Sequence, residues 1–147
     1  MRVAIYKLSM QEKVLYNLGW LLEKLCKSKK IGIFCDSGAV EAIDRALWTF
    51  STNAFLPHWI ATGTDSDIRQ PVLISGNLDE LKNREIVCVF DNTKLFETIK
   101  QNHDATDVIY MTQDDVDVEN LQKTISEIGK SVKFDVFAKQ NNKWIKL

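Results

Sequence analysis

Short apolar segments alternate with segments of helical character along most of this chain. Residues 31–35 and 86–90 are continuous apolar runs of strand length, which is typical of strands covered on both faces, as in parallel sheets. Other short runs of this kind and the helical segments between them complete the alternation: strands at 2–8, 72–74, 108–111 and 133–138, helices at 10–27, 40–50, 95–99 and from 114 to near 130. The pattern predicts an α/β fold with three layers, a central, mainly parallel sheet with helices on both faces. We expect residues 1–147 to form a single domain.

Several local signals refine this outline. Ser9 is predicted to cap the first helix, which would then begin at Met10. Residues 51–70 combine Pro, Gly, Ser, Thr and Asp and indicate an irregular loop. Asn141 and Asn142 indicate a turn, so the chain is expected to end in a strand or hairpin.

The charge distribution restricts the class of partner. The formal net charge is −1, which argues against nucleic-acid binding over the whole surface. From residue 123 to the end, six lysines accompany one Glu and one Asp, so this stretch carries +4 and the first 122 residues carry −5. A basic end on a near-neutral chain indicates either a local anionic partner or a solvated surface.

The cysteines and the hydropathy of the sequence indicate the cellular compartment in which the protein is expected. Cys35 and Cys88 lie inside apolar runs and are expected to be buried, reduced thiols, and Cys26 lies at the basic end of the first predicted helix. Neither a disulfide framework nor a zinc site is indicated, which favours a reducing, cytoplasmic location. No apolar stretch reaches the length of a membrane span, about 18 residues.

Catalytic signatures are sparse. Asp36, Asp91 and Asp114 follow predicted strands, where they would either cap helices or converge on Mg²⁺ in a small phosphoryl-transfer or nucleotide-handling enzyme. The glycine-rich motifs that cradle phosphates are absent from the sequence. Neither His58, in an aromatic-rich segment, nor His103, in a polar one, belongs to a recognised nucleophilic motif. We therefore assign no catalytic residue, metal ligand or cofactor.

Aromatic residues are concentrated after the second predicted helix. Core packing accounts for Trp48, whereas Phe55 and Trp59 fall in the predicted loop, and loops usually lie on the surface. Exposed aromatic residues are typical anchors of protein interfaces, and stacking on single-stranded nucleic acid is the alternative, against which the near-neutral charge counts. His58 and Trp59 are further candidates for such an interface.

Residues 42–48 (Ala-Ile-Asp-Arg-Ala-Leu-Trp), followed by Phe55-Leu56-Pro57-His58 and by residues 71–75 (Pro-Val-Leu-Ile-Ser), resemble the chi subunit family of bacterial DNA polymerase III. That resemblance implies an accessory subunit associated with the clamp loader in DNA replication, without an active site of its own. It also implies two partners: a psi subunit and the acidic C-terminal tail of single-stranded DNA-binding protein, which ends in Pro-Phe. Contact with DNA itself would be weak or indirect.

The resemblance further implies a pocket for that tail. An apolar slot would take the terminal Phe and a cation would meet its carboxylate. By the family pattern this site includes Phe55, Lys130 and a strand-end position near Thr112, with Lys123 and Lys133 as nearby substitutes for missing cations. The chain departs from the family where Lys, Arg and Tyr are replaced by Gln122, Ser126 and Gly129, which predicts weakened tail binding.

Overall fold

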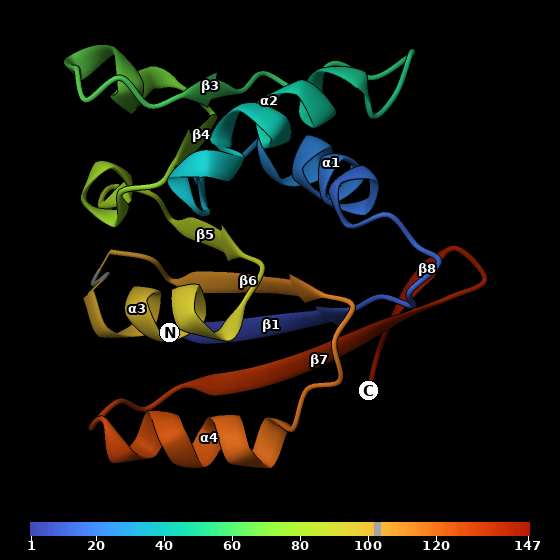
Figure 1. Cartoon of the computed structure of the whole chain (residues 1–147), viewed down its shortest axis with the longest axis vertical. Coiled ribbons are helices and arrows are strands. Elements are labelled where there is room, and N and C mark those ends of the chain that lie inside the picture. Colours follow the sequence, from blue (N-terminus) through green and yellow to red (C-terminus); the bar gives the residue numbers. More distant parts are fainter. Residues whose placement is uncertain (102–103) are drawn as a thin grey trace.

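The computed structural model describes residues 1–101 and 104–147, and all eight strands found there belong to one sheet. The strand order is β3-β4-β2-β5-β6-β1-β7-β8, and every neighbouring pair is parallel except β7 and β8 (Figure 1). The predicted α/β class with a mainly parallel sheet is therefore confirmed. The three adjacent strands β4, β2 and β5 are buried at every residue, as their apolar runs require.

The strands and helices have these bounds. The strands are β1 (Arg2–Lys7), β2 (Ile31–Phe34), β3 (Trp59–Ile60), β4 (Val72–Ser75), β5 (Ile86–Val89), β6 (Asp107–Thr112), β7 (Lys133–Gln140) and β8 (Lys143–Lys146). The α-helices within the described residues are α1 (Val14–Leu25), α2 (Val40–Thr49), α3 (Asn92–Gln101) and α4 (Val118–Glu127). Short 3-10 helices occupy Ser37–Ala39, Asp65–Arg69 and Leu78–Leu81.

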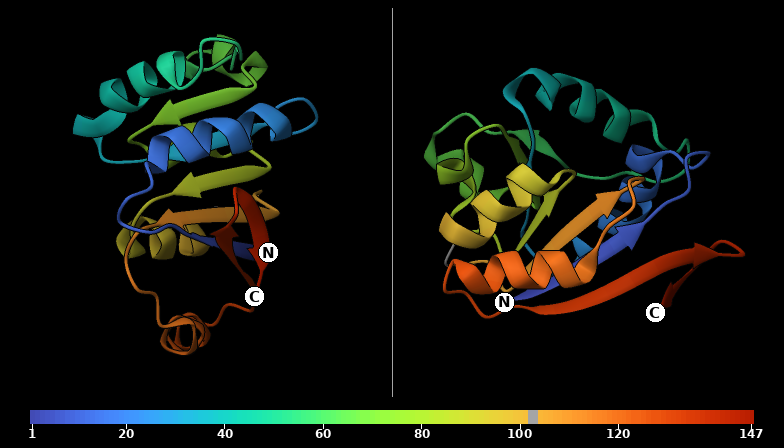
Figure 2. Two further views of the ribbon diagram at one scale, coloured as in Figure 1. Left: turned by 90° about the vertical axis from the view of Figure 1, so that its right-hand side faces the viewer. Right: turned by 60° about the horizontal axis from the view of Figure 1, so that its bottom comes forward.

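Helices cover both faces of the sheet, which produces two apolar cores. One core packs α1 and α2 against Ile33, Ile74 and Cys88, and the other packs α3 and α4 against Val87 and Val108. Alternate residues of a strand point to opposite faces, so Val87 and Cys88 of β5 belong to different cores. Figure 2 shows the two helical layers from two further directions. No helix of the described residues is long and apolar enough to cross a membrane.

The chain ends in a β-hairpin, as the asparagine pair predicts. Asn141 and Asn142 have φ angles of 51° and 63° and join the antiparallel strands β7 and β8. Two successive residues with positive φ form a turn of type I′, whose twist suits a two-residue hairpin. The hairpin extends the sheet beyond β1 at the end opposite to β3.

Three local expectations are wrong. The last helix does not begin at Asp114, because α4 begins at Val118 with Asp117 as its N-cap. Helix α1 begins at Val14 and its N-cap is Lys13, because Ser9 instead closes a separate turn in which its carbonyl oxygen accepts a hydrogen bond from Glu12 N at 3.1 Å. The segment 51–70 is not wholly irregular, since it contains β3 and a 3-10 helix. Strand β3 has only two residues and pairs with β4 alone, which leaves too short a pattern to detect in the sequence.

Candidate functional site

An aromatic surface lies at the β3 end of the sheet and consists of Trp48, Phe55 and Trp59. These side chains are 53%, 67% and 49% exposed. The rings of Trp48 and Phe55 lie 5.8 Å apart between centroids, and Trp48 and Trp59 line one hollow of about 370 Å³. The expectation that Trp48 packs in the core is wrong, because it lies on the outer side of α2, while Ile43 and Leu47 of that helix face the sheet.

His58 supports this surface from below. Its side chain is buried, and its Nδ1 and Nε2 atoms lie 2.6 Å from Leu56 O and 3.1 Å from Asp44 O. The imidazole also packs against the ring of Trp48, with 4.5 Å between centroids. His58 thus ties the segment after α2 back to the helix and holds Trp48 outward, and it does not itself extend to the molecular surface.

A second candidate site is the α4 groove, a hollow of about 430 Å³ between α4 and the start of β7. Ile125, Val132 and Phe134 supply its apolar parts, and Lys130 supplies a half-buried cation. Gly129 makes this geometry possible. Its φ of 77° ends the helix, with Gly129 N donating to Ser126 O at 3.0 Å and Lys130 N donating to Ile125 O at 3.3 Å.

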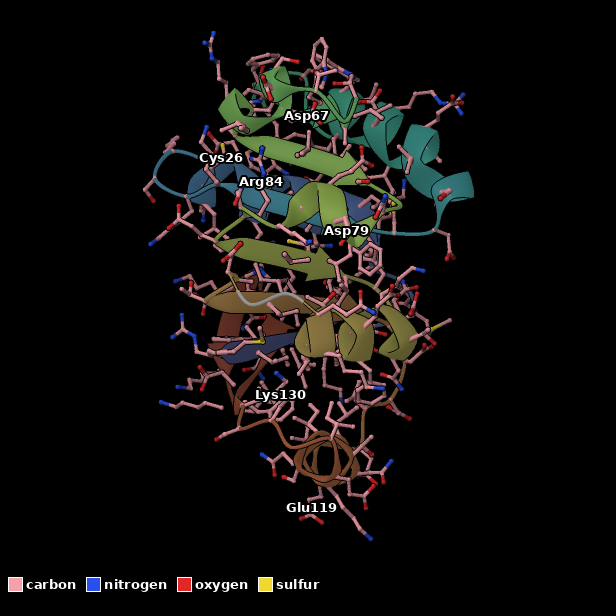
Figure 3. The ribbon with its side chains drawn as sticks, turned by 90° about the vertical axis from the view of Figure 1, so that its left-hand side faces the viewer. Cys26, Asp67, Asp79, Arg84, Glu119 and Lys130 are labelled. Carbon is pink, nitrogen blue, oxygen red and sulfur yellow. The ribbon has the colours of Figure 1, made fainter. Side chains whose placement is uncertain are left out.

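The structure does not bring the predicted tail-pocket residues together. Phe55 belongs to the aromatic surface and precedes β3, whereas Lys130 and Lys133 adjoin β7, and five strands lie between β3 and β7. At about 4.8 Å per strand, β3 and β7 are roughly 29 Å apart. Figure 3 shows Lys130 near α4 and Asp67, of the segment after β3, at the opposite end. A pocket shared by Phe55 and Lys130 is therefore incorrect.

Thr112 is also remote from the lysines. It pairs with Lys7 at the carboxyl end of the parallel strands, level with Ala138, whereas Lys133 pairs with Arg2 at the amino end. The five-residue offset along β7 amounts to about 16 Å. Thr112 is buried, and its Oγ1 accepts a hydrogen bond from Asp114 N at 3.0 Å, so it shapes the turn after β6.

The three residues that depart from the family pattern lie together in the structure. Gln122, Ser126 and Gly129 all line the α4 groove with Lys130, while Lys123 is exposed on the same helix. Among the described residues that line the groove, Lys130 is the one cation. The groove thus offers an apolar floor with a single positive charge at its helix end.

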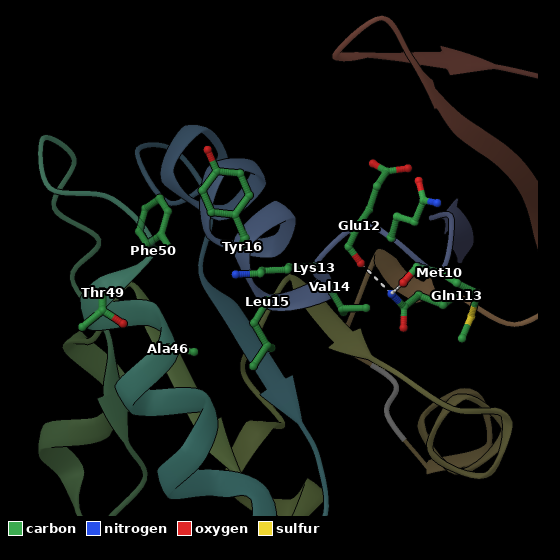
Figure 4. A pocket seen from close by; sticks show the side chains of 11 residues that line it. Met10, Glu12, Lys13, Val14, Leu15, Tyr16, Ala46, Thr49, Phe50 and Gln113 are labelled. Atoms are coloured by element: carbon green, nitrogen blue, oxygen red, sulfur yellow. Dashed lines mark hydrogen bonds between the residues drawn. The ribbon is translucent and has the colours of Figure 1, made fainter.

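A further hollow, which the sequence did not indicate, lies between the start of α1 and the end of α2 (Figure 4). Its volume is about 640 Å³, and its walls include Met10, Leu15 and Phe50. Gln113 closes one side by donating from Nε2 to Glu12 O. Its described lining contains neither a cysteine nor a histidine, and Lys13, Tyr16 and Thr49 are among its polar residues.

The acidic residues at the strand ends have structural partners. Asp91 Oδ1 accepts a hydrogen bond from Lys94 N at 2.8 Å and caps α3, and Asp36 Oδ1 lies 3.1 Å from Lys94 Nζ. Asp114 takes part in the Thr112 turn. Among residues 1–101 and 104–147, no three His, Cys, Asp or Glu side chains gather as metal ligands do. Of the three acids only Asp91 caps a helix, because the Asp36 side chain makes no capping hydrogen bond and α4 is capped by Asp117 instead of Asp114. His103 lies outside the described residues.

Comparison with known families bears directly on these surfaces. Residues 1–124 match the family described as DNA polymerase III chi subunit, HolC, a range that includes the aromatic surface and most of α4 but not β7 and β8. A search of curated proteins finds no match to this chain. Since the match spans 124 of the 147 residues, the chain belongs to the DNA polymerase III chi subunit family.

Proposed function

We propose that this accessory subunit of DNA polymerase III links the psi subunit to the C-terminal tail of single-stranded DNA-binding protein and catalyses no reaction itself. The observation that carries the proposal is the presence of two unlike surfaces, aromatic and basic-apolar, at opposite ends of one continuous sheet. Such a separation allows two partners to bind at once without competing for the same residues.

The aromatic surface is suited to psi. Trp48, Phe55 and Trp59 expose large rings on a support fixed by the buried Leu56 and His58. Rings held in this way lose little conformational freedom on binding, and Trp in particular is enriched among the residues that dominate interface energies.

The α4 groove is suited to the acidic tail. Its apolar floor of Ile125, Val132 and Phe134 would accept the terminal Phe, and Lys130 would pair with the terminal carboxylate. Because Gln122, Ser126 and Gly129 add no further charge, we expect modest affinity that falls as salt rises.

Calorimetric titration with a peptide of the last ten or so tail residues tests the groove, since recognition of a chain terminus needs only a short segment. Lys130→Glu should weaken binding about tenfold or more, as loss of a charge-assisted hydrogen bond implies. Lys100→Glu makes the same charge change at an exposed position of α3 and should leave binding unchanged. A peptide without the terminal Phe should not bind. Equal effects of the two lysine variants would refute the assignment.

Co-purification with psi tests the aromatic surface. Trp48→Ala and Phe55→Ala should each weaken the complex by about 2 kcal/mol or more, or about 30-fold. Tyr16→Ala removes a ring of similar exposure from α1 and serves as the control. If Phe55→Ala abolishes tail binding and spares psi, the two surfaces have been assigned the wrong way round.

A further inference from the structure

A groove between α1 and the terminal hairpin, about 350 Å³ in volume, combines aromatic rings with cations. Here it is called the hairpin groove. Tyr16, Trp20 and Lys24 line it from α1, and Lys139 and Trp144 line it from the hairpin. None of the described residues that line it carries a carboxylate. The hairpin lies beyond residue 124, so this wall comes from the part of the chain that the family match does not reach.

One cation of the groove is held in a fixed position. Asn17 is a buried polar residue on the inner side of α1; its Nδ2 donates to Lys13 O at 2.8 Å, and its Oδ1 accepts a hydrogen bond from Lys139 Nζ. The same ammonium group lies 5.9 Å from the centroid of the Trp144 ring. A lysine side chain usually extends freely into water. Here the buried amide of Asn17 holds the Lys139 ammonium group beside the face of Trp144. The groove thus places a fixed positive charge, which can bind an anion, next to an aromatic ring on which a base can stack.

The rings of the groove are also supported. Trp20 packs edge to face on Phe50 and Trp144 packs edge to face on Tyr6, with centroid distances of 5.3 and 4.9 Å. Trp20 nevertheless remains 38% exposed and Tyr16 45% exposed. Aromatic side chains that are fixed on one side and open on the other provide the platforms on which unpaired bases stack.

The charge around the groove is positive although the chain as a whole carries −1. Lys24 and Lys139 line it, and the hairpin also carries Lys143. Lys146 adds no net charge, because its Nζ lies 3.0 Å from Asp135 Oδ1 and the two charges offset each other. An acidic peptide would satisfy the cations alone, whereas single-stranded nucleic acid would satisfy both the cations and the exposed ring faces.

We propose that the hairpin groove binds single-stranded nucleic acid, with bases stacked on Trp20 and Trp144 and phosphates bound by Lys24 and Lys139. The groove lies on the α1 side of the sheet, whereas the α4 groove lies on the other side. The inference goes beyond the proposed function and does not rest on it, because neither psi nor the protein tail takes part.

Fluorescence anisotropy of a labelled oligothymidine with the full chain tests the groove across about 50 to 200 mM salt. Two phosphate contacts predict a slope of log affinity against log salt of about −1.4, and Lys24→Gln should reduce it to about −0.7. Lys100→Gln removes the same charge from an exposed position of α3 and should leave the slope and the affinity unchanged. Trp20→Ala should weaken binding about tenfold, and the oligonucleotide should quench tryptophan fluorescence of the unmutated chain.

Absence of binding at the lowest salt would overturn the proposal, as would equal losses in Lys24→Gln and Lys100→Gln. Lys24 is exposed, so its replacement tests the groove even if Trp20→Ala impairs folding. An acidic peptide lacking the terminal Phe provides the last comparison. The proposal is wrong, and the groove is a peptide site, if that peptide binds, if Lys24→Gln weakens its binding, and if the oligonucleotide does not displace it.

Discussion

Asp67 shows how a single residue orders the segment after β3. Its carboxylate accepts hydrogen bonds from Thr62 N, at 3.1 Å to each oxygen, from Thr62 Oγ1 at 2.9 Å and from Gly63 N at 2.9 Å. Burial would raise the pKa of Asp67, but these donors and the nearby Arg84 outweigh it, and the pKa lies below its usual value.

Asp67→Asn should therefore destabilise the protein by about 1–3 kcal/mol, because an amide replaces one acceptor oxygen with a donor and leaves a backbone N–H unpaired. The lowered pKa means that this stabilisation is present above the unfolded-state value of about 3.9 and is lost as pH falls through the folded-state value. Urea unfolding should thus show a large difference between wild type and variant at neutral pH and a smaller one near pH 3. Asp65→Asn, exposed on the same turn, is the control; an equal loss there would contradict the argument.

Residue roles are only partly predictable from sequence. The burial of Cys35 and Cys88 follows from their apolar neighbours, and both thiols are buried. Trp48 was placed in the core incorrectly, because an aromatic residue on a short amphipathic helix gives no sign of whether it lies just inside or just outside the buried stripe. The support that His58 gives Trp48 could not be foreseen either, since Asp44 and Leu56 meet it only in the folded chain.

At the scale of elements, the terminal hairpin depends on its turn. Asn141 and Asn142 both have positive φ, a conformation that Asn tolerates and β-branched residues do not. Asn141→Val should destabilise the hairpin by about 1–2 kcal/mol. Faster amide hydrogen exchange in β8 would report the effect. Gln140→Val, one residue earlier at the exposed last position of β7, should slow exchange or leave it unchanged. A similar acceleration in both variants would show that the turn conformation is not the cause.

Element types are more predictable than element ends. Strands β2 and β5 were predictable because four or five consecutive apolar residues need cover on both faces. The start of α1 was misplaced because Ser9 has the composition of a cap but its hydrogen bonds close a turn with Glu12. The type I′ turn was predictable from two adjacent asparagines, since few residue pairs accept that conformation.

At the scale of the whole molecule, strand order decides which residues meet. β1 opens the chain yet lies between β6 and β7, more than a hundred residues away in sequence. No local pattern encodes that insertion, so the sequence could not show that Phe55 and Lys130 lie at opposite ends of the sheet. The family resemblance implied one tail pocket containing both residues, and the strand order places them too far apart for that.

The same order makes β5 the link between the two halves of the sheet, β3-β4-β2 on one side and β6-β1-β7-β8 on the other. Cys88 lies in β5 and is completely buried, and burial raises the pKa of its thiol to about 12. Because its side chain lies in the core between the sheet and the layer of α1 and α2, its exposure requires that layer to leave the sheet. A chain that retains only Cys88 should therefore react with a thiol reagent near pH 8 at a rate set by global unfolding. A chain that retains only the half-buried Cys26 should react much faster, because a local opening is enough to expose this thiol. Denaturant well below the unfolding midpoint should accelerate the Cys88 reaction in step with the global free energy of unfolding. Similar rates for the two chains would mean instead that the layer of α1 and α2 opens locally.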